Sequence, residues 1–140
     1  MLAIMKRILG LFAFVLLASA PALAGYGSIG GRIVDDAGRP LANVPVAIFA
    51  LPLHQGEIAA SSLTTNRNGY FSKVGVNAGR YLVRADVDGN AVACAVDDVN
   101  GGWNTHLVLR VHGSDVACRG PRAHAASVNS SITADEYILH

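Results

Sequence analysis

The chain is poor in charge, in aromatic side chains and in lysine. Charged residues make up 15% of its 140 residues and aromatic residues 6%, and Lys73 is the only lysine after residue 24. Removing Lys6 and Arg7 from the 11 basic residues leaves nine against 10 acidic ones, a formal charge of −1. Such a surface has no excess positive charge with which to hold nucleic acid or an anionic membrane. A single lysine also disfavours an internal isopeptide crosslink, which needs a buried lysine beside an asparagine and an acid.

Long apolar runs are absent except at the N-terminus. Lys6 and Arg7 precede the apolar run Ile8–Leu17, and small residues stand at Ala22–Ala24. This order is typical of a secretory signal, so we predict a cleaved signal peptide over residues 1–24. The run is too short to cross about 30 Å of hydrocarbon. The prediction is a secreted or periplasmic protein with no membrane span after signal removal.

Cysteine is scarce, with only Cys94 and Cys118 in the whole chain. In an exported protein an even pair of cysteines is usually bridged, and we predict an internal disulfide. Closing a loop of this length contributes on the order of 3–4 kcal/mol. Two reduced thiols, or a bridge to a second chain, are the alternatives that the sequence leaves open.

Apolar residues alternate with polar ones through most of the chain, and no stretch after residue 24 has a helical stripe. Asn68-Gly69 and Asp88-Gly89 separate alternating segments and each predict a hairpin turn, because primed turns favour Asn, Asp or Gly. We therefore predict an all-β fold, a seven-stranded antiparallel β-sandwich over residues 25–111. Residues 112–140 are expected to form a C-terminal tail that the disulfide tethers. The predicted strands centre on residues 28–33, 44–50, 62–64, 70–74, 80–87, 92–96 and 105–111.

Three segments carry a resemblance to a known family. Gly31–Val46 (GRIVDDAGRPLANVPV), Thr65–Phe71 (TNRNGYF) and Ala78–Tyr81 (AGRY) resemble, in order and spacing, the motifs of carboxypeptidase regulatory-like domains. The resemblance covers about residues 27–111 and implies a transthyretin-like (prealbumin-like) sandwich. Asn66 and Lys73 depart from the usual pattern. We expect scaffold roles for the motif residues Gly38, Pro40, Gly69, Phe71, Gly79 and Tyr81.

Some enzymes share the transthyretin fold, so we compare their characteristic residues with this sequence. Hydroxyisourate hydrolases resemble one another through a C-terminal Tyr-Arg-Gly-Ser, whereas this chain ends in Tyr137–His140 (YILH). The two tyrosines and two histidines of intradiol dioxygenases have no clear counterpart. We therefore expect no catalytic residues and no enzyme activity, and a transthyretin-fold hydrolase remains a remote alternative.

Metal and cofactor sites are also not expected. His106 and His112 lie six residues apart on one predicted strand, about 20 Å, which is too far to ligate one ion. A cluster of His112, Cys118 and His124 would need the disulfide to be absent. Asp86 and Asp88 lack the spacing of a calcium loop.

The predicted function is an exported, non-catalytic module with a binding or structural role in the cell envelope or outside the cell. Trp103, in a Gly-rich turn, is expected to cover one end of the sandwich, with stacking on a sugar ring as the alternative. Tyr137, Ile138 and Leu139 form a short apolar end. They suggest the alternative function, an accessory subunit of an envelope or surface assembly that docks through its tail, or they are simply unstructured. The partner would be a protein or a carbohydrate.

Overall fold

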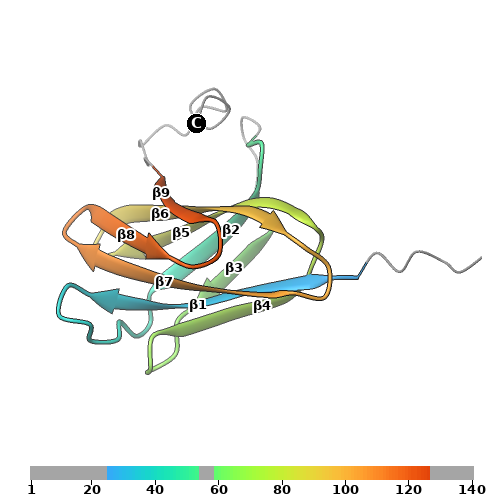
Figure 1. Cartoon of the computed structure of the whole chain (residues 1–140). Coiled ribbons are helices and arrows are strands. Elements are labelled where there is room, and N and C mark those ends of the chain that lie inside the picture. Colours follow the sequence, from blue (N-terminus) through green and yellow to red (C-terminus); the bar gives the residue numbers. More distant parts are fainter. Residues whose placement is uncertain (1–24, 54–58, 127–140) are drawn as a thin grey trace, which may run out of the picture.

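The described part of the chain is built from strands alone. The computed structural model describes residues 25–53 and 59–126, and within these ranges it contains two stacked β-sheets and no helix (Figure 1). The all-β sandwich prediction is confirmed. The predicted signal peptide 1–24 lies outside the described residues. The strands are β1 (Gly27–Asp35), β2 (Pro45–Ala50), β3 (Ser61–Thr64), β4 (Tyr70–Val76), β5 (Gly79–Val87), β6 (Asn90–Val99), β7 (Asn104–His112), β8 (Asp115–Arg119) and β9 (Ala123–Ala126).

The strand count corrects the sequence prediction. Nine strands lie in the described ranges, not seven, in a four-stranded sheet of order β4-β1-β7-β8 and a five-stranded sheet of order β3-β2-β5-β6-β9. The two additional strands, β8 and β9, lie in the stretch predicted to be a tail, so the sandwich continues past residue 111 to Ala126. Both are short, β8 lies between Gly113 and Gly120, and β9 is mostly alanine, which hides their alternation in the sequence.

The prediction of a wholly antiparallel sandwich is also wrong in one place. β1 pairs in parallel with β7, in a register that runs from Ser28 opposite Asn104 to Asp35 opposite Val111. Every other strand pair is antiparallel. The parallel pair arises because the chain leaves β1, builds other strands of both sheets, and returns beside β1 in the same direction. The starts of β1 and β7 therefore lie at the same end of the sandwich.

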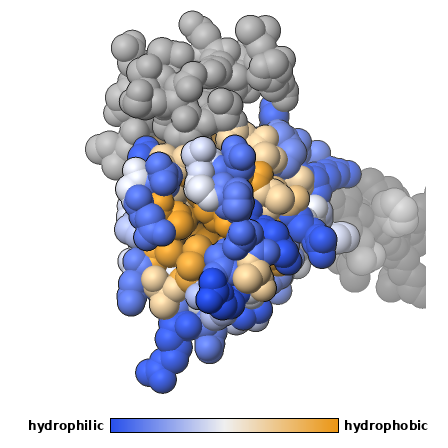
Figure 2. Space-filling model, turned by 90° about the vertical axis from the view of Figure 1, so that its left-hand side faces the viewer, coloured by the Kyte–Doolittle hydropathy of each residue, from blue (hydrophilic) through white to orange (hydrophobic). Residues whose placement is uncertain are grey.

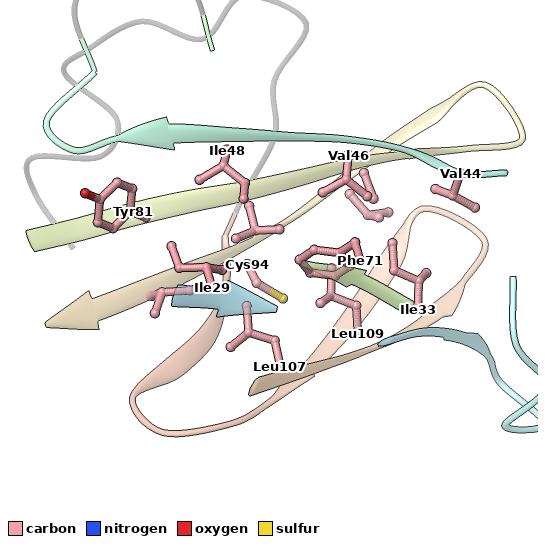
Figure 3. Close-up of a cluster of buried hydrophobic side chains, with 14 of the residues drawn as sticks. Ile29, Ile33, Val44, Val46, Ile48, Phe71, Tyr81, Cys94, Leu107 and Leu109 are labelled. Atoms are coloured by element: carbon pink, nitrogen blue, oxygen red, sulfur yellow. The ribbon is translucent and has the colours of Figure 1, made fainter. Parts of the chain in front are cut away.

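The core lies between the two sheets. Ile29 and Ile33 of β1 and Leu107 and Leu109 of β7 face β2, β5 and β6, and all four are fully buried (Figure 3). Period-2 alternation turns every second residue of each strand into this layer, as expected. Each such side chain contributes about 1.5–3 kcal/mol on burial. Phe71 from β4 and Tyr81 from β5 complete the layer, and the Tyr81 hydroxyl donates to the Asn77 carbonyl at 2.6 Å.

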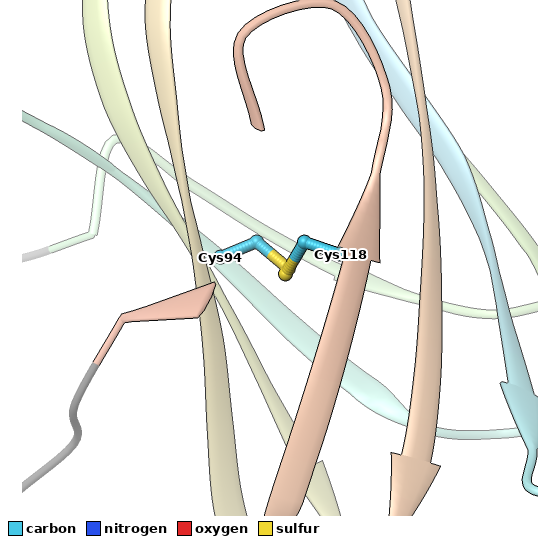
Figure 4. Close-up of a disulfide and its surroundings, with 2 residues drawn as sticks. All are labelled: Cys94 and Cys118. Carbon is cyan, nitrogen blue, oxygen red and sulfur yellow. A yellow bond between two sulfur atoms is a disulfide. The ribbon is translucent and has the colours of Figure 1, made fainter. Parts of the chain in front are cut away.

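The two sheets are joined covalently. Cys94 of β6 and Cys118 of β8 form a disulfide, with their Cα atoms 6.1 Å apart (Figure 4). The predicted internal disulfide is thus confirmed. Since β6 belongs to the five-stranded sheet and β8 to the four-stranded one, the bridge ties one layer to the other. It also fixes β8, so part of the predicted tail becomes part of the sandwich.

The two glycine turns differ in what they connect. Asp88 and Gly89 both have positive φ, 48° and 80°, as the primed turn of a tight hairpin requires, and they join β5 to β6. Gly69, with φ of 76°, instead precedes β4 and follows β3 of the other sheet. A Cβ there would come within 2.7 Å of the Ile33 carbonyl oxygen, so only glycine lets this crossover pack against β1. The Asn68-Gly69 turn is therefore not the hairpin that the sequence predicted.

The crossover is also held by a buried hydroxyl. Thr65 is 2% exposed. Its Oγ1 accepts from the Val44 amide at 2.9 Å and donates to the Leu41 carbonyl at 2.7 Å. Asn66 follows, and its side-chain oxygen accepts from the amides of Asn68 and Tyr70. The direction in which the chain enters β4, and hence the placement of Tyr70, is fixed by these bonds.

Candidate functional site

The outer face of the four-stranded sheet carries a broad hollow of about 550 Å³. We call it the outer-face hollow. It runs across three neighbouring strands, β4, β1 and β7, and continues round the edge of β4 to the nearby residues of β3. On the sheet, the hollow is lined by Ser28, Gly30, Tyr70, Phe71, Ser72, Val74, Asn104, Thr105 and His106. Past the edge of β4, it is lined by Leu63, Thr64 and Asn66.

Strand register explains why residues far apart in sequence meet there. Gly30 of β1 lies opposite Ser72 of β4 on one side and His106 of β7 on the other. In the next outward-facing row, Ser28 lies between Val74 and Asn104. The middle strand therefore contributes a hydrogen atom and a hydroxymethyl group where its neighbours contribute larger side chains. This difference in side-chain size produces the hollow.

Two aromatic rings lie over this small-residue floor. The rings of Tyr70 and His106, from strands on either side of β1, have centroids 6.2 Å apart and planes tilted by 42°. The gap left by Gly30 lets side chains from the two outer strands approach across β1. Tyr70 remains 42% exposed, so much of its ring is open to a ligand.

Arg32 holds the tyrosine in place. Its guanidinium carbon lies 5.3 Å from the Tyr70 ring centroid, and its Nε donates to the Asn68 carbonyl at 3.1 Å. A cation over an exposed tyrosine ring contributes about 0.5–1 kcal/mol. Because Arg32 is engaged with the ring and the backbone, the site presents a fixed aromatic surface.

The polar groups of the hollow are hydroxyl, amide and imidazole groups. The Ser28 hydroxyl donates to the Asn104 side-chain oxygen, which leaves the Asn104 amide nitrogen to donate outward. Ser72 adds a hydroxyl and His106 a ring nitrogen. Among the described residues that line the hollow there is no carboxylate, lysine or arginine. This composition suits an uncharged ligand that carries many hydroxyl groups.

Trp103 lies at one end of the same sheet. It is 70% exposed and therefore covers little of the sandwich end, contrary to the role expected first. Tyr26, 68% exposed, lies beside it, because the Gly102 amide donates to the Tyr26 carbonyl at 3.0 Å. The other predicted contact residues, Tyr137, Ile138 and Leu139, lie outside the described residues.

A second hollow, of about 400 Å³, lies at the opposite end of the sandwich, beside the β5–β6 and β7–β8 turns. Leu41, Val87 and Val111 form its apolar part, and Figure 2 shows apolar side chains gathered between polar ones on this end. His112 Nδ1 lies 2.8 Å from an Asp36 carboxylate oxygen on its rim, but both side chains are more than half exposed. We interpret this end as the open margin of the core.

Several acidic side chains elsewhere pair with neighbouring bases. Asp35 accepts from the Arg39 amide and from its Nε, each at 2.8 Å. The backbone bond from Arg39, followed by its guanidinium, lowers the pKa of Asp35 despite an opposing desolvation effect. Asp86, of the calcium-like segment, pairs with Arg84 at 3.2 Å. Burial, in contrast, raises the pKa of Tyr81.

The residues that the sequence analysis tested as metal ligands make other contacts. His106 faces Tyr70, His112 faces Asp36, and Cys118 is in the disulfide. No group of three histidine, cysteine or acidic side chains that could hold a metal ion occurs in residues 25–53 and 59–126. Within the same ranges there is also no helix that is long and apolar enough to cross a membrane.

Sequence reasoning did not identify the outer-face hollow. Among the sequence predictions, Tyr70 belongs only to the Thr65–Phe71 motif, and His106 enters only the metal-site hypothesis. One feature of the sequence does point to the hollow. Ser28, Gly30, Ser72 and His106 occupy outward-facing positions of their strands, and all four are small or polar. Strand order, which alternation alone does not determine, is needed to bring them together.

Comparison with known proteins agrees with the architecture. A family model described as carboxypeptidase regulatory-like domain matches residues 28–101, and no curated protein matches the chain. The 5-hydroxyisourate hydrolase of Klebsiella pneumoniae is similar in structure, with a TM-score of 0.50 and 15% identity over 67% of this chain and 92% of that one. An (S)-allantoin synthase has a TM-score of 0.54 and 14% identity over 76% of this chain and 48% of its own.

At such low identity these structures show a shared fold alone, and that fold is the transthyretin-like sandwich that the sequence motifs implied. The family match spans more than half of the chain and begins inside β1, at the first of the quoted motifs. The chain belongs to the carboxypeptidase regulatory-like domain family.

Proposed function

We propose that this chain is an exported, non-catalytic binding domain that holds its ligand in the outer-face hollow. The observation that carries the proposal is the Tyr70 and His106 ring pair above the Gly30 floor, surrounded by neutral hydrogen-bonding groups. A half-exposed ring with a fixed partner on one side is a surface for recognition, because it offers apolar contact at little cost in side-chain entropy.

Export is supported by two independent features. The N-terminal segment has the order of a secretory signal, and the Cys94–Cys118 disulfide is of a kind that forms and persists in oxidising compartments. A rigid sandwich bridged between its layers can hold an open binding face without a covering domain. These features together favour a role in the periplasm or outside the cell.

The absence of catalysis is supported by the chemistry of the hollow. Acid–base or nucleophilic catalysis needs paired titratable groups within hydrogen-bond reach. The described lining offers His106 and Tyr70, with ring centroids 6.2 Å apart, and no carboxylate or thiol between them. The arrangement suits holding a ligand better than transforming one.

Affinity measurements on a panel of ligand classes test this proposal. The panel contains cello- and chito-oligosaccharides, acidic oligosaccharides, and a mixed library of extended peptides, each titrated against the purified, disulfide-bonded protein. Tyr70→Ala should weaken binding of the selected class about two- to ten-fold, since a stacking contact contributes about 0.5–1.5 kcal/mol. Tyr70→Phe, which keeps the ring, should stay close to wild type. Equal affinities for wild type and Tyr70→Ala across the panel would contradict the proposal.

A further inference from the structure

Three exposed aromatic residues lie in or directly beside the four-stranded sheet. Tyr70 stands beside Arg32, which lies near the end of β1, while Tyr26 and Trp103 stand just before the starts of β1 and β7. From Tyr26 to Arg32 is six residues of extended chain, about 20 Å. The Ser28 and Gly30 floor of the outer-face hollow lies between these ends.

Backbone hydrogen bonds fix the chain at Tyr26 and Trp103. The Ser28 amide donates to the Trp103 carbonyl at 3.0 Å, and the Gly102 amide donates to that of Tyr26 at the same distance. A Cβ on Gly27 would come within 2.7 Å of the Asn100 carbonyl oxygen, so glycine permits this close approach. Because both segments are fixed, binding would order little of the backbone there, which keeps the entropic cost low.

Resting on the proposed function, we propose that the ligand is a linear neutral oligosaccharide, bound along β1 from Tyr70 toward Tyr26 and Trp103. A sugar ring offers an apolar face that stacks on aromatic rings and hydroxyl groups at its rim that pair with amides and hydroxyls. The hollow offers the ring of Tyr70 together with the hydroxyl and amide groups of Ser28, Ser72 and Asn104. Tyr26 and Trp103 lie beyond its lining, just before β1 and β7. A span of about 20 Å accommodates several rings, so the ligand is a chain of sugars.

The charge of the surface distinguishes this ligand from other classes. An anionic polymer would need cations, yet the described lining contains no lysine or arginine, and the nearby Arg32 is engaged with Tyr70 and Asn68. An extended peptide would pair with the free edge of β4 through backbone hydrogen bonds. It would not need the ring of Tyr26 or Trp103.

A chain-length series tests the inference. Isothermal titration of cello- and chito-oligosaccharides, from the dimer to the hexamer, should show affinity in at least one series, rising with length and then reaching a plateau. Tyr26→Ala and Trp103→Ala should each lower the affinity of the hexamer about five- to ten-fold and leave that of the dimer within about two-fold. Tyr70→Ala should weaken both. Asn90→Ala, in the hairpin at the opposite end of the molecule, is the control and should change neither.

The outcomes separate the inference from the proposed function. If neither neutral series binds while peptides or acidic oligosaccharides bind in a Tyr70-dependent way, the glycan inference is wrong and the proposed function stands. If neutral oligosaccharides bind but affinity does not change from dimer to hexamer, the extended site along β1 is wrong. If no member of the panel binds the folded protein, both proposals fail.

Discussion

The two sheets of this domain differ most in their outer faces. On the five-stranded sheet, Leu82 is fully buried and packs with Leu53 and Ala93 in a second, smaller apolar cluster. On the four-stranded sheet, the corresponding surface leaves Tyr70 and Val74 exposed above a floor of Ser28 and Gly30. In the part of the chain that the structure describes, the five-stranded sheet carries this apolar cluster on its outer face, whereas the four-stranded sheet carries the hollow.

This difference suggests separate roles for the two outer faces, one that stabilises the fold and one that is proposed to bind a ligand. An apolar residue on an outer face stabilises the fold only where the chain folds back over it, as the segment with Leu53 does over Leu82. Among the described residues, the other face keeps Tyr70 and Val74 exposed and carries hydroxyl and amide groups beside them. Stability should therefore respond to changes on one face and binding to changes on the other.

The largest expected effect concerns the bridge between the sheets. Reduction of Cys94–Cys118, or its replacement in Cys94→Ala/Cys118→Ala, should lower the free energy of unfolding by about 3 kcal/mol, because the unfolded chain regains the entropy of an open loop. Urea unfolding with and without reductant measures this. The double variant should be insensitive to reductant, and an unchanged wild-type midpoint on reduction would show that the bridge contributes little.

Paired truncations of the two outer faces sharpen the comparison directly. Leu82→Ala should destabilise by about 2–3 kcal/mol, since it leaves a cavity under the covering segment. Val74→Ala, where Val74 is 72% exposed, should change stability by less than about 0.5 kcal/mol. Equal losses in thermal or urea unfolding would mean that the two faces do not differ as described.

The crossover between the sheets should show a smaller effect. Thr65→Val keeps the side-chain volume but leaves the Val44 amide and the Leu41 carbonyl without their partner, which costs about 1–2 kcal/mol. Thr64→Val, on the exposed neighbouring residue, is the matched control. Urea midpoints that fall equally for the two variants would assign the loss to the local chain and not to the buried hydroxyl.

The smallest effect expected is a pH dependence at the end of β1. Because the fold lowers the pKa of Asp35, chiefly through the Arg39 amide, this carboxylate stabilises the protein above the unfolded-state pKa, and the contribution disappears as pH falls through the folded value. Asp35→Asn should flatten the acid limb of the stability curve. Arg39→Gln keeps the backbone donor, so a carboxyl titration by NMR should still give a lowered pKa for Asp35. A pKa back at its ordinary value would show that the guanidinium dominates.

Much of the fold could be predicted from the sequence, for a local reason. Alternation along β1 and β5 places Ile29, Ile33 and Val83 in the core without knowledge of any neighbour, and the three motifs identified the family. β8 and β9 could not be predicted, because apolar and polar residues alternate too weakly in short segments rich in small residues. Their place in the sandwich depends on the Cys94–Cys118 bridge and on pairing with distant strands.

The candidate site could not be predicted for the opposite reason. Ser28, Tyr70 and His106 become neighbours only through the sheet order β4-β1-β7, and that order includes a parallel pair between strands more than 70 residues apart. Individually these residues are ordinary outward-facing positions. Trp103 is recognisable as an aromatic residue in a glycine-rich turn, but its proximity to Tyr26 depends on the Gly102–Tyr26 backbone hydrogen bond, which no sequence pattern predicts.

Amide proton–nitrogen correlation spectra of the labelled protein, recorded while members of the ligand panel are added, test the central claim most directly. The account predicts that the shifted amides cluster on β4, β1 and β7 around Gly30, Ser72 and His106, with little change at Leu82 on the other sheet. Shifts confined to the β5–β6 and β7–β8 turns, or to the outer face of the five-stranded sheet, would contradict it.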